Sequence, residues 1–478
     1  MGEPMYLAVD QGGHASRALV FDADGRTVGS AFAAIGTARN ALGHVEHDAD
    51  ELVAATRQAI DDVAQHVGTR TADIASAGLV TQRSTIVCWD RTTGSALSPA
   101  ISWQDRRNAR WLQRLAPRAA WIKSRTGLVL SPHYGASKLR WCLDHLIAVK
   151  RAAADGRLAL GPLSSYLAFR LLTDKPFVVD PANASRTLLY DPQALDWSAE
   201  LLELFGIARE WLPACRPSVD AHGALSVAGR AVPVTVMTGD QSAVPFAWGS
   251  PASDCVFVNV GTGAFAQRTL SEPLPAGSGL LTSVVLQDGR NVTLAHEGTV
   301  NGAGSALQWL AESEGIDTAR LLEALDSTDV EALNPPLFLN GVSGLGAPFW
   351  VSDFESRFLG PGTPLEKFVG VLESIAFLIR VNIDEMRRVP PPLRSIILTG
   401  GLARSAYFCQ CLADLVELDV KRMDEPEASA RGVACLMAGL PNSWQAAPGE
   451  IFSSKSNGAL LARYVAWLRN LKTILSTT

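Results

Sequence analysis

The sequence lacks several features that define other classes of protein. It has no excess of positive charge, since 42 Lys and Arg oppose 48 Asp and Glu, and this argues against nucleic acid or an anionic membrane as the main partner. No apolar stretch is long enough to span a bilayer, and the N-terminus has no signal-peptide pattern. We therefore expect a soluble, cytoplasmic protein.

Cysteine is scarce and shows no paired spacing. The seven cysteines are scattered, and Cys409 and Cys411, with one residue between them, fit no common zinc-binding spacing. An odd, scattered set in a long chain predicts buried thiols in a reducing compartment.

Two familiar kinase signatures are also absent. The chain has no Walker motif, which excludes a P-loop kinase, and nothing matches the HRD and DFG motifs of protein kinases. What is present is the balance of a folded protein, with 47% hydrophobic and 19% charged residues. A chain of 478 residues is too long for one core, so we expect two large domains or three smaller ones.

Hydrophobic periodicity predicts the main elements. Residues 6–22 (YLAVDQGGHASRALVFD) indicate a strand, a glycine turn and a second strand, and residues 255–270 (CVFVNVGTGAFAQRTL) repeat that pattern. A Gly-, Pro- and Ser-rich linker at 248–254 separates the two halves, which suggests a duplicated architecture. Helices are predicted over 50–66, over 136–150, after Trp197 up to Gly206, and over 366–387.

Glycine turns recur at the ends of predicted strands, at residues 10–13, 260–263 and 399–401, and a further strand ends at Asp240. Each is a typical turn by itself. Glycines also let a ligand approach the backbone, where free N–H groups attract anions. Together with the carboxylates of Asp10 and Asp240, these turns suit phosphoryl transfer, which needs phosphate donors, a metal ligand and a base.

Longer motifs then follow one another along nearly the whole chain. They are TQRSTIVCWDRTTGSAL, NASRTLLYD, GDQSA, VGTGAF, EGTVNGAGSALQWL, GLGAPFW and GGLARSAYFCQCLADL. In this order they resemble the FGGY carbohydrate kinases, most closely the glycerol kinase branch. The resemblance implies an α/β fold of two ribonuclease H-like (actin-like ATPase) domains with a catalytic cleft between them. Residues 1–249 would bind the sugar or polyol and the metal, and residues 250–478 the nucleotide.

The resemblance also implies ATP and Mg²⁺ as cofactors and a role for each matching residue. Asp240 would be the general base, and Asp10 and Asp240 would hold the metal. The substrate-binding positions are Arg83, Ser84, Trp103, His133, Asp240, Gln241 and Phe265. The nucleotide-binding positions are Gly12, Gly13, His14, Arg17, Gly261, Thr262, Gly263, Gly400, Gly401 and Ser405.

The sequence departs from the family pattern in two places. The family has two hydroxyl residues where this chain has Gly13 and Ala15, so backbone N–H groups and His14 are expected to contact phosphate instead. Glycerol kinases carry glutamate where this chain has Ser84, and tyrosine where it has His133. Losing a buried acceptor changes discrimination between hydroxyl-bearing substrates. We therefore expect glycerol not to be the best substrate, unless neighbouring side chains replace the lost contacts.

Two other functions share this fold. A catalytically weak sensor of sugar or nucleotide would explain the lost hydroxyls, although Asp10 and Asp240 are both present. An actin- or chaperone-type ATPase would act on protein partners, but Arg83 and Trp103 match polyol contacts instead. The expected partners are ATP and a small sugar or polyol, with no nucleic acid and no membrane. A homo-oligomer is left open.

Overall fold

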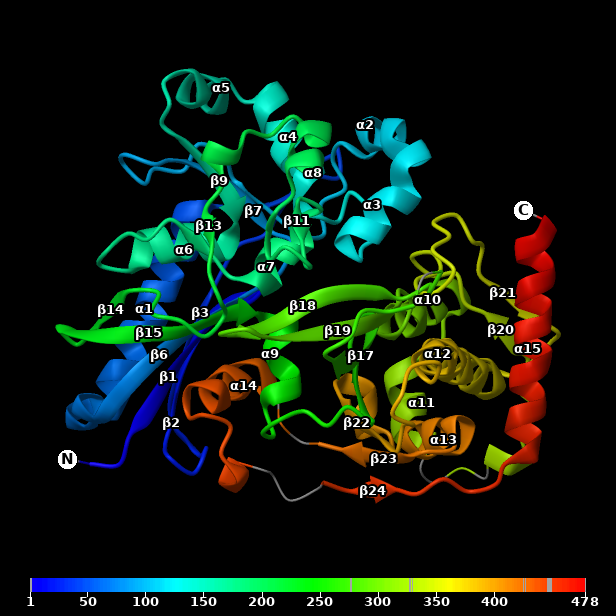
Figure 1. The fold of residues 1–478 in the computed structure, drawn as a ribbon. Helices are drawn as coiled ribbons and strands as arrows, with labels where there is room; N and C mark the ends of the chain where they lie inside the picture. Colours follow the sequence, from blue (N-terminus) through cyan, green and yellow to red (C-terminus); the bar gives the residue numbers. More distant parts are fainter. Residues whose placement is uncertain are drawn as a thin grey trace. The chain divides into compact units, whose positions relative to one another are not determined.

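The computed structural model describes residues 2–477 except 276, 326, 327, 329, 424, 426 and 445–448. The chain forms two compact units of mixed α and β structure (Figure 1). Unit 1 consists of Met1–Pro251, Thr282–Ala295 and Glu427–Gln445, and unit 2 of Ala252–Leu281, His296–Pro426 and Ala446–Thr478. The first crossing between the units lies in the predicted linker. The functional boundary between residues 249 and 250 stays a prediction.

Unit 1 is built on a six-stranded sheet. Its strand order is β14 (Ala224–Val227), β15 (Arg230–Gly239), β6 (Ile74–Thr81), β1 (Met5–Gln11), β2 (Ala15–Phe21) and β3 (Thr27–Ala34). Strand β1 is antiparallel to β2 and parallel to β6, and β15 is parallel to β6. The carboxyl ends of β1, β6 and β15 therefore meet at one edge of the sheet.

Unit 2 repeats this arrangement. Its strands belong to a seven-stranded sheet. The order is β18 (Leu281–Asp288), which lies almost entirely in unit 1, then β19 (Asn291–Val300), β17 (Ala264–Leu270), β16 (Cys255–Val260), β22 (Ser395–Thr399), β23 (Asp419–Arg422) and β24 (Ile451–Phe452). Strand β16 is antiparallel to β17 and parallel to β22, just as β1 is to β2 and β6. The first residues of β19 belong to unit 1. The duplicated strand–turn–strand pattern is confirmed.

A smaller sheet in unit 1 carries several of the predicted substrate positions. Its order is β4 (Ala38–Arg39), β5 (Val45–His47), β8 (Ala100–Ile101), β7 (Ile86–Asp90) and β9 (Leu158–Pro162). Arg83 and Ser84 lie between β6 and β7, and Trp103 follows β8. Because β7 and β8 are neighbours in this sheet, the segment with Arg83 and Ser84 lies next to the segment with Trp103.

The predicted helices form, with one exception. Helix α1 (Ala49–Val67) is capped by Asp48, α8 (Ala199–Phe205) ends at Gly206, and α12 (Pro364–Met386) starts with a capping box. The helix predicted over 136–150 is instead two helices, α4 (Gly135–His145) and α5 (Ile147–Ala154), separated by Leu146. Leu146 has an extended backbone, with ψ of 115°, which cannot continue a helix.

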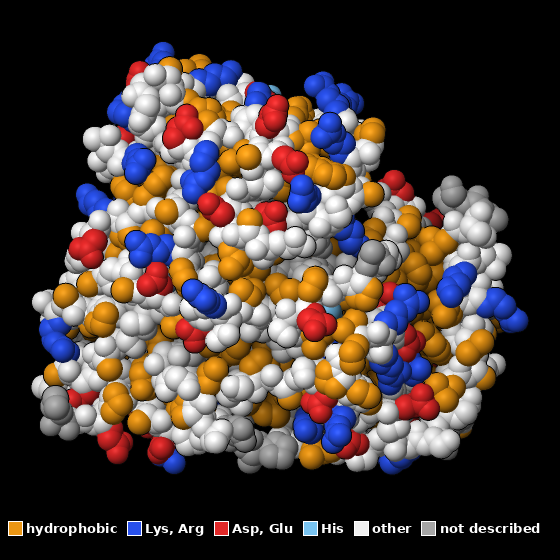
Figure 2. Space-filling model, viewed as in Figure 1, with side chains coloured by type: hydrophobic (Ala, Val, Ile, Leu, Met, Phe, Trp, Pro, Cys, Tyr) orange, Lys and Arg blue, Asp and Glu red, His pale blue; other side chains and the backbone are white. Residues whose placement is uncertain are grey.

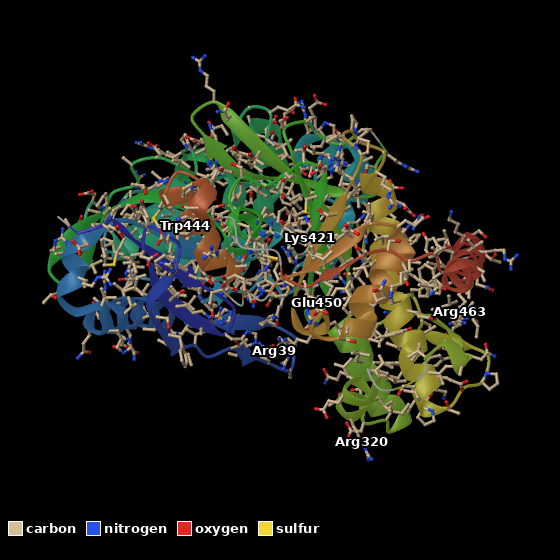
Figure 3. All side chains as sticks on the ribbon, turned by 90° about the horizontal axis from the view of Figure 1, so that it is seen from below. Arg39, Arg320, Lys421, Trp444, Glu450 and Arg463 are labelled. Atoms are coloured by element: carbon tan, nitrogen blue, oxygen red, sulfur yellow. The ribbon has the colours of Figure 1, made fainter. Side chains whose placement is uncertain are left out.

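Helix α14 (Ala428–Met437) comes late in the chain but packs in unit 1. Its buried residues form one core with residues of β1, β2, β6 and β15. Trp444, which follows it and is labelled in Figure 3, donates from Nε1 to the Ala23 carbonyl (2.9 Å). Its ring packs against Tyr6 and Phe21. Unit 1 is thus completed by residues more than 400 positions from its first strand.

The surface and the thiols agree with the composition. Lys and Arg side chains alternate with Asp and Glu on the face shown in Figure 2. All seven cysteines are free thiols, six of them buried and Cys215 partly buried. Across the described residues, we find no helix with the length and apolar content to cross a membrane.

Candidate active site

Two predicted carboxylates meet at the edge of the unit 1 sheet. Val80 in β6 pairs with Asp10 on one side and with Thr238 on the other. Asp240 begins the short helix α9 (Asp240–Ala243), two residues beyond Thr238. When neighbouring parallel strands are in register at their carboxyl ends, the residues that follow them lie close together. The register therefore places the acidic groups of β1 and β15 at one site.

Asp10 is held in an unfavourable environment for a carboxylate. It is only 5% exposed, and its Oδ1 has no hydrogen-bond partner. Burial raises its pKa to about 7, and the negative charges of Asp240 and Glu427 add to this effect. Arg17, directly opposite in β2, lowers the pKa, but its guanidinium also pairs with Glu427 at 3.0 Å.

This arrangement fits a magnesium ion. A buried carboxylate oxygen without a donor, beside a second carboxylate, is relieved by a divalent cation. Mg²⁺ typically takes one or two carboxylates and completes its shell with water and phosphate oxygens. Among the described residues no three His, Cys, Asp or Glu side chains form a metal-binding group. Asp10 and Asp240 are the pair that would hold the ion.

Asp240 is oriented by two neighbours. Its Oδ1 accepts from the Gln241 N–H (2.6 Å) and lies 4.0 Å from Arg83 Nε. The Arg83 side chain is almost fully buried, whereas the Asp240 carboxylate remains 23% exposed. The geometry thus leaves this carboxylate accessible to a ligand while its direction is fixed, as a general base requires.

The polyol positions of unit 1 cluster around Trp103. Its ring lies 5.7 Å from the ring of His133. Burial, and next the charge of Lys138, keep the pKa of His133 well below its usual value, so His133 is neutral. Ser84 has a left-handed backbone (φ 64°), and its buried Oγ has no hydrogen-bond partner. That hydroxyl is therefore available to a ligand.

Lys138 organises this cluster, although the sequence analysis did not select it. Its buried Nζ donates to the carbonyls of Ser84 (3.0 Å), Ser102 (2.8 Å) and His133 (2.7 Å). These three carbonyls belong to the three segments that carry the polyol positions, since Ser102 directly precedes Trp103. The ammonium thus fastens the segments to one another. A lysine on a helix ordinarily indicates a surface, so no sequence signal marked it.

The first glycine turn, residues 10–13, lies next to the polyol-binding positions. Gly12 donates to the Ala15 carbonyl (3.0 Å), and its own carbonyl accepts from Gln82 Nε2 (3.2 Å). A Cβ at Gly13 would lie 4.0 Å from Trp103 Nε1. His14 follows as an exposed residue of the turn. The turn is therefore tied to the segment that contains Arg83 and lies beside Trp103.

In unit 2 the second glycine turn, residues 261–263, is stabilised by backbone bonds. Gly261 donates to the Gly263 carbonyl (2.9 Å). The first residues of α10 (Gly304–Glu314) donate to the carbonyls of Gly261 and Thr262. A Cβ at Gly263 would lie 2.9 Å from a backbone oxygen, so a larger residue does not fit there.

The third glycine turn lies directly beside the second. The parallel pairing of β16 and β22 aligns Asn259 with Thr399. Gly400 follows with a φ of 95°, and a Cβ there would lie 2.5 Å from the Val260 carbonyl oxygen. Only glycine suits this position. The predicted phosphate-binding residues of unit 2, including Gly401, are thus assembled at one edge of its sheet.

Two predicted residues of unit 2 have other surroundings. Ser405 is buried, and its Oγ accepts from the Phe408 N–H (3.3 Å) as the cap of α13 (Ala406–Val416). Phe265 lies in β17 opposite Asn259, next to the second glycine turn. Their proposed contacts with nucleotide and substrate stay predictions.

The structure thus brings the predicted residues together in two groups. Unit 1 gathers those for metal, base and polyol: Asp10, Gly12, Gly13, His14, Arg17, Arg83, Ser84, Trp103, His133, Asp240 and Gln241. Unit 2 gathers Gly261, Thr262, Gly263, Phe265, Gly400, Gly401 and Ser405.

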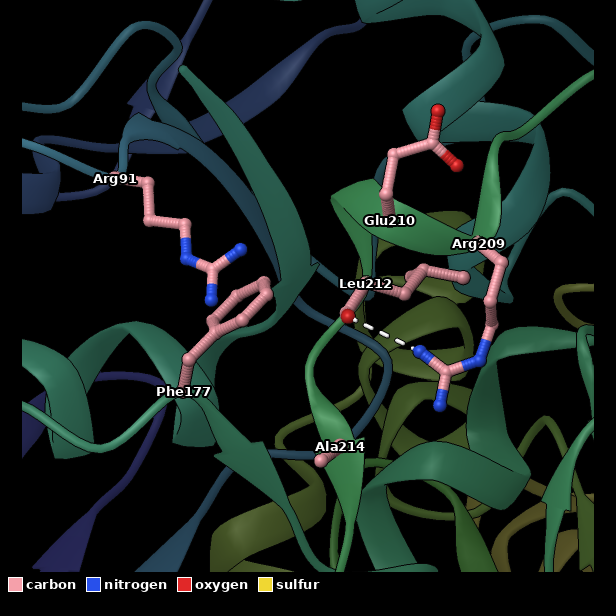
Figure 4. Close-up of a pocket in the computed structure, with 6 residues that line it drawn as sticks. All are labelled: Arg91, Phe177, Arg209, Glu210, Leu212 and Ala214. Carbon is pink, nitrogen blue, oxygen red and sulfur yellow. Dashed lines mark hydrogen bonds between the residues drawn. The ribbon is translucent and has the colours of Figure 1, made fainter. Parts of the chain in front are cut away.

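A separate cavity of about 440 Å³ in unit 1 contains none of these residues (Figure 4). Arg91 lies over the ring of Phe177 there, and Arg209 donates to the Leu212 carbonyl (3.3 Å). Glu210 also lines this cavity, but the cavity contains neither a glycine turn nor either of the predicted aspartates, Asp10 and Asp240.

Known proteins share both the sequence and the fold. The N-terminal domain of the FGGY family of carbohydrate kinases matches residues 5–261, and its C-terminal domain matches residues 256–439. The glycerol kinase 1 of Pseudomonas aeruginosa is 35% identical over 91% of this chain and 89% of its own length.

Two solved structures have the same fold over nearly the whole length. A Plasmodium falciparum glycerol kinase with ADP has a TM-score of 0.89, at 22% identity, over 99% of this chain and 98% of its own. A ligand-bound xylulose kinase from Lactobacillus acidophilus has a TM-score of 0.84, at 20% identity, over the same shares. The chain belongs to the FGGY family of carbohydrate kinases, and it is an ATP-dependent kinase that works with Mg²⁺.

Proposed function

We propose that the chain transfers the γ-phosphate of ATP to a hydroxyl of a small sugar or polyol, and that glycerol is not its best substrate. The proposal that glycerol is not the best substrate rests on the residue at position 84, which is Ser84. Glycerol kinases have glutamate at this position, whereas here a short, neutral hydroxyl is buried without a partner. Serine cannot accept two charge-assisted bonds from a substrate, and it leaves more room. A substrate with more than three carbons suits such a site.

In this proposal the residues of unit 1 prepare the acceptor hydroxyl. Asp240 takes its proton as the hydroxyl attacks, with Arg83 and the Gln241 N–H holding the carboxylate in place. Asp10 would hold Mg²⁺ together with Asp240. The bound ion compensates the negative charge of the phosphates. Arg17 and the backbone N–H of Gly13 would contact the transferring group, and Gly12, whose N–H donates to the Ala15 carbonyl, would let it approach the turn closely.

The glycine turns of unit 2 would hold the nucleotide. Thr262 and Gly263 would offer their backbone N–H groups to the β- and γ-phosphates beside Gly261, whose own N–H donates to the Gly263 carbonyl. Gly400 and Gly401 would contact the α-phosphate. Their side chains are absent or small, so the phosphates approach the backbone directly. Ser405 completes the predicted nucleotide contacts, and Phe265 would contact the substrate.

The test is a coupled assay of ADP release with the full chain, Mg²⁺ and ATP. Glycerol is compared with polyols and ketoses of four to six carbons. We expect a longer compound to give the highest kcat/KM. Glycerol as the fastest substrate would refute the substrate proposal, and release that no compound stimulates would instead indicate a sensor.

Asp240→Asn tests the assignment of the base. It should abolish transfer and leave nucleotide binding intact, whereas Asp61→Asn, an exposed carboxylate on α1, should change neither. Substantial turnover in Asp240→Asn would show that another group accepts the proton.

A further inference from the structure

The proposed function gives no role to the motif at residues 183–191 (NASRTLLYD). Its first part folds as a short helix, α7 (Pro181–Ala184), and a further helical turn over Ser185–Thr187. Every residue of these two turns is buried, including the polar side chains of Asn183 and Arg186. Buried polar side chains are paired as a rule, so the partners of these two residues indicate what the motif does.

A buried aspartate fixes the orientation of Asn183. The fully buried Asp180 side chain accepts from the Asn183 N–H (2.9 Å) and from its Nδ2 (2.8 Å). Because Nδ2 faces the carboxylate, Oδ1 of the same amide is left to accept from Thr81 Oγ1 (3.3 Å). Asn183 is therefore held by Asp180 on one side and bonds to strand β6 on the other.

Thr81 lies in the row of the sheet between the two predicted aspartates. It pairs with Gln11, which follows Asp10, and with Gly239, which precedes Asp240. Ladder hydrogen bonds join these three parallel strands, so a shift of the middle residue is passed to its neighbours on both sides. The bond from Thr81 to the motif thus anchors the row next to which both carboxylates lie.

This anchor lies on the face of the sheet opposite α14. Successive side chains of a strand point to opposite faces, and Val80, next to Thr81, packs in one core with residues of α14. Leu79 shares the face of Thr81 and packs in the other core of unit 1. The edge with the two aspartates is therefore held from both faces, by α14 on one and by Asn183 on the other.

The other end of the segment reaches the polyol positions. The guanidinium of Arg186 lies over the ring of Tyr134, 5.3 Å from its centre. The Tyr134 ring in turn meets the His133 ring edge-on, at 5.0 Å. Burial and next the charge of Lys138 lower the pKa of His133 most, and the charge of Arg186 adds to them. An arginine removed from water binds an aromatic face more strongly than an exposed one does, so Arg186 restrains the Tyr134 ring against which His133 packs.

We propose that residues 180–187 form one positioning element that holds both parts of the unit 1 site. Asn183, acting through Thr81, fixes the spacing of the two predicted aspartates. Arg186, acting through Tyr134, orients the histidine of the polyol site. The roles of the aspartates and of this histidine rest on the proposed function, whereas the contacts of the segment do not. Both positioning residues act through another residue, so neither touches the substrate.

The first test removes the bond between Thr81 and Asn183 with little change of shape. Thr81→Val should lower kcat about tenfold with the KM for glycerol within twofold, because the aspartates lose their spacing while the polyol positions keep theirs. It should also weaken Mg²⁺ binding, measured by calorimetry, about tenfold, as groups behind a metal ligand typically do. Thr81→Ser keeps the hydroxyl and should stay within twofold of the parent. Thr126→Val, at an equally buried threonine that ends α3 (Ala119–Thr126), should change neither quantity.

The second test removes the charge over the Tyr134 ring. Arg186→Met should raise the KM for glycerol, and for the fastest compound of the coupled assay, about tenfold, with kcat and Mg²⁺ affinity within twofold. The NMR signal of the His133 ring, identified by its loss in His133→Asn, should also shift. Arg186→Lys keeps a charge over the ring and should recover part of the loss. Arg170→Met removes a guanidinium that lies 5.4 Å from the Tyr166 ring, and it should change none of these readouts.

Several results would overturn the proposal. One is a Thr81→Val variant with unchanged kcat and Mg²⁺ affinity, or a Thr81→Ser variant that is equally impaired. Another is a parallel change of kcat and KM in both Thr81→Val and Arg186→Met, which would indicate a general structural role. Mg²⁺ binding and the His133 signal are read without turnover, so they decide the proposal even if no compound is phosphorylated. That last outcome would count against the proposed function alone.

Discussion

Asp10→Asn should make the metal-free protein more stable while it destroys activity. The carboxylate is buried beside Asp240, and its pKa is raised from 3.8 to about 7. Because the folded state binds this proton more tightly than the unfolded state, the free energy of unfolding is highest below about pH 4 and falls as pH rises towards 7. Asparagine has the same shape and carries no charge, so it escapes this cost.

The size of the effect follows from the pKa. A rise of about three units corresponds to about 4 kcal/mol of destabilisation above pH 7, at 1.36 kcal/mol per unit. Burying an amide without full hydrogen bonding costs about 1–3 kcal/mol in proteins. A net gain of about 2 kcal/mol at pH 8 is therefore expected for Asp10→Asn, with little or no gain at pH 4.

Urea unfolding in the presence of EDTA measures this gain at both pH values. Asp61→Asn, on the exposed face of α1, is the matched control and should not change stability. Turnover with Mg²⁺ and ATP should fall by two orders of magnitude or more in Asp10→Asn, by analogy with other lost electrostatic contacts to a reacting centre. An Asp10→Asn variant that is less stable than the parent at pH 8 would refute the reasoning.

Three further outcomes are expected. Mg²⁺ binding, followed by calorimetry, should tighten as pH rises through about 7, because the Asp10 carboxylate must lose its proton to coordinate the ion; binding independent of pH would contradict its role. Lys138→Met removes the donor of three carbonyls, each worth about 1–3 kcal/mol when orphaned. It should raise the KM for the polyol at least tenfold while the Kd for ATP, measured separately, stays within twofold, and a parallel loss of both would indicate a general structural role. Gly263→Ala places a methyl group 2.9 Å from a backbone oxygen in unit 2 and should weaken ATP binding with the polyol Kd unchanged; unaltered ATP affinity would argue against a phosphate role for this turn.

Local sequence signals predicted the elements that frame the site. Alternating apolar runs around glycine turns identified β1 with β2 and β16 with β17, because strand and turn preferences act over a few residues. The break at Leu146 was missed, since the apolar spacing of 136–150 continues through it and only the backbone reveals two helices.

Long-range features could not be predicted in this way. Glu427 lies 410 residues beyond its partner Arg17, and nothing in either neighbourhood indicates the pair. Lys138 is buried by segments from three parts of the chain, so its role depends on the tertiary fold. The raised pKa of Asp10 likewise requires strands β1 and β15 to be in place. The chemistry of the site is thus a property of the assembled sheet.

The three-segment construction of unit 1 also has a consequence for biosynthesis. The core around Val433 and Trp444 closes against β1 and β6, which leave the ribosome hundreds of residues earlier. The apolar faces of these strands stay exposed until α14 has been translated. During that time they can bind chaperones or aggregate. A nascent chain stopped before residue 427 should consequently be protease-sensitive throughout its first half, however complete its other strands are.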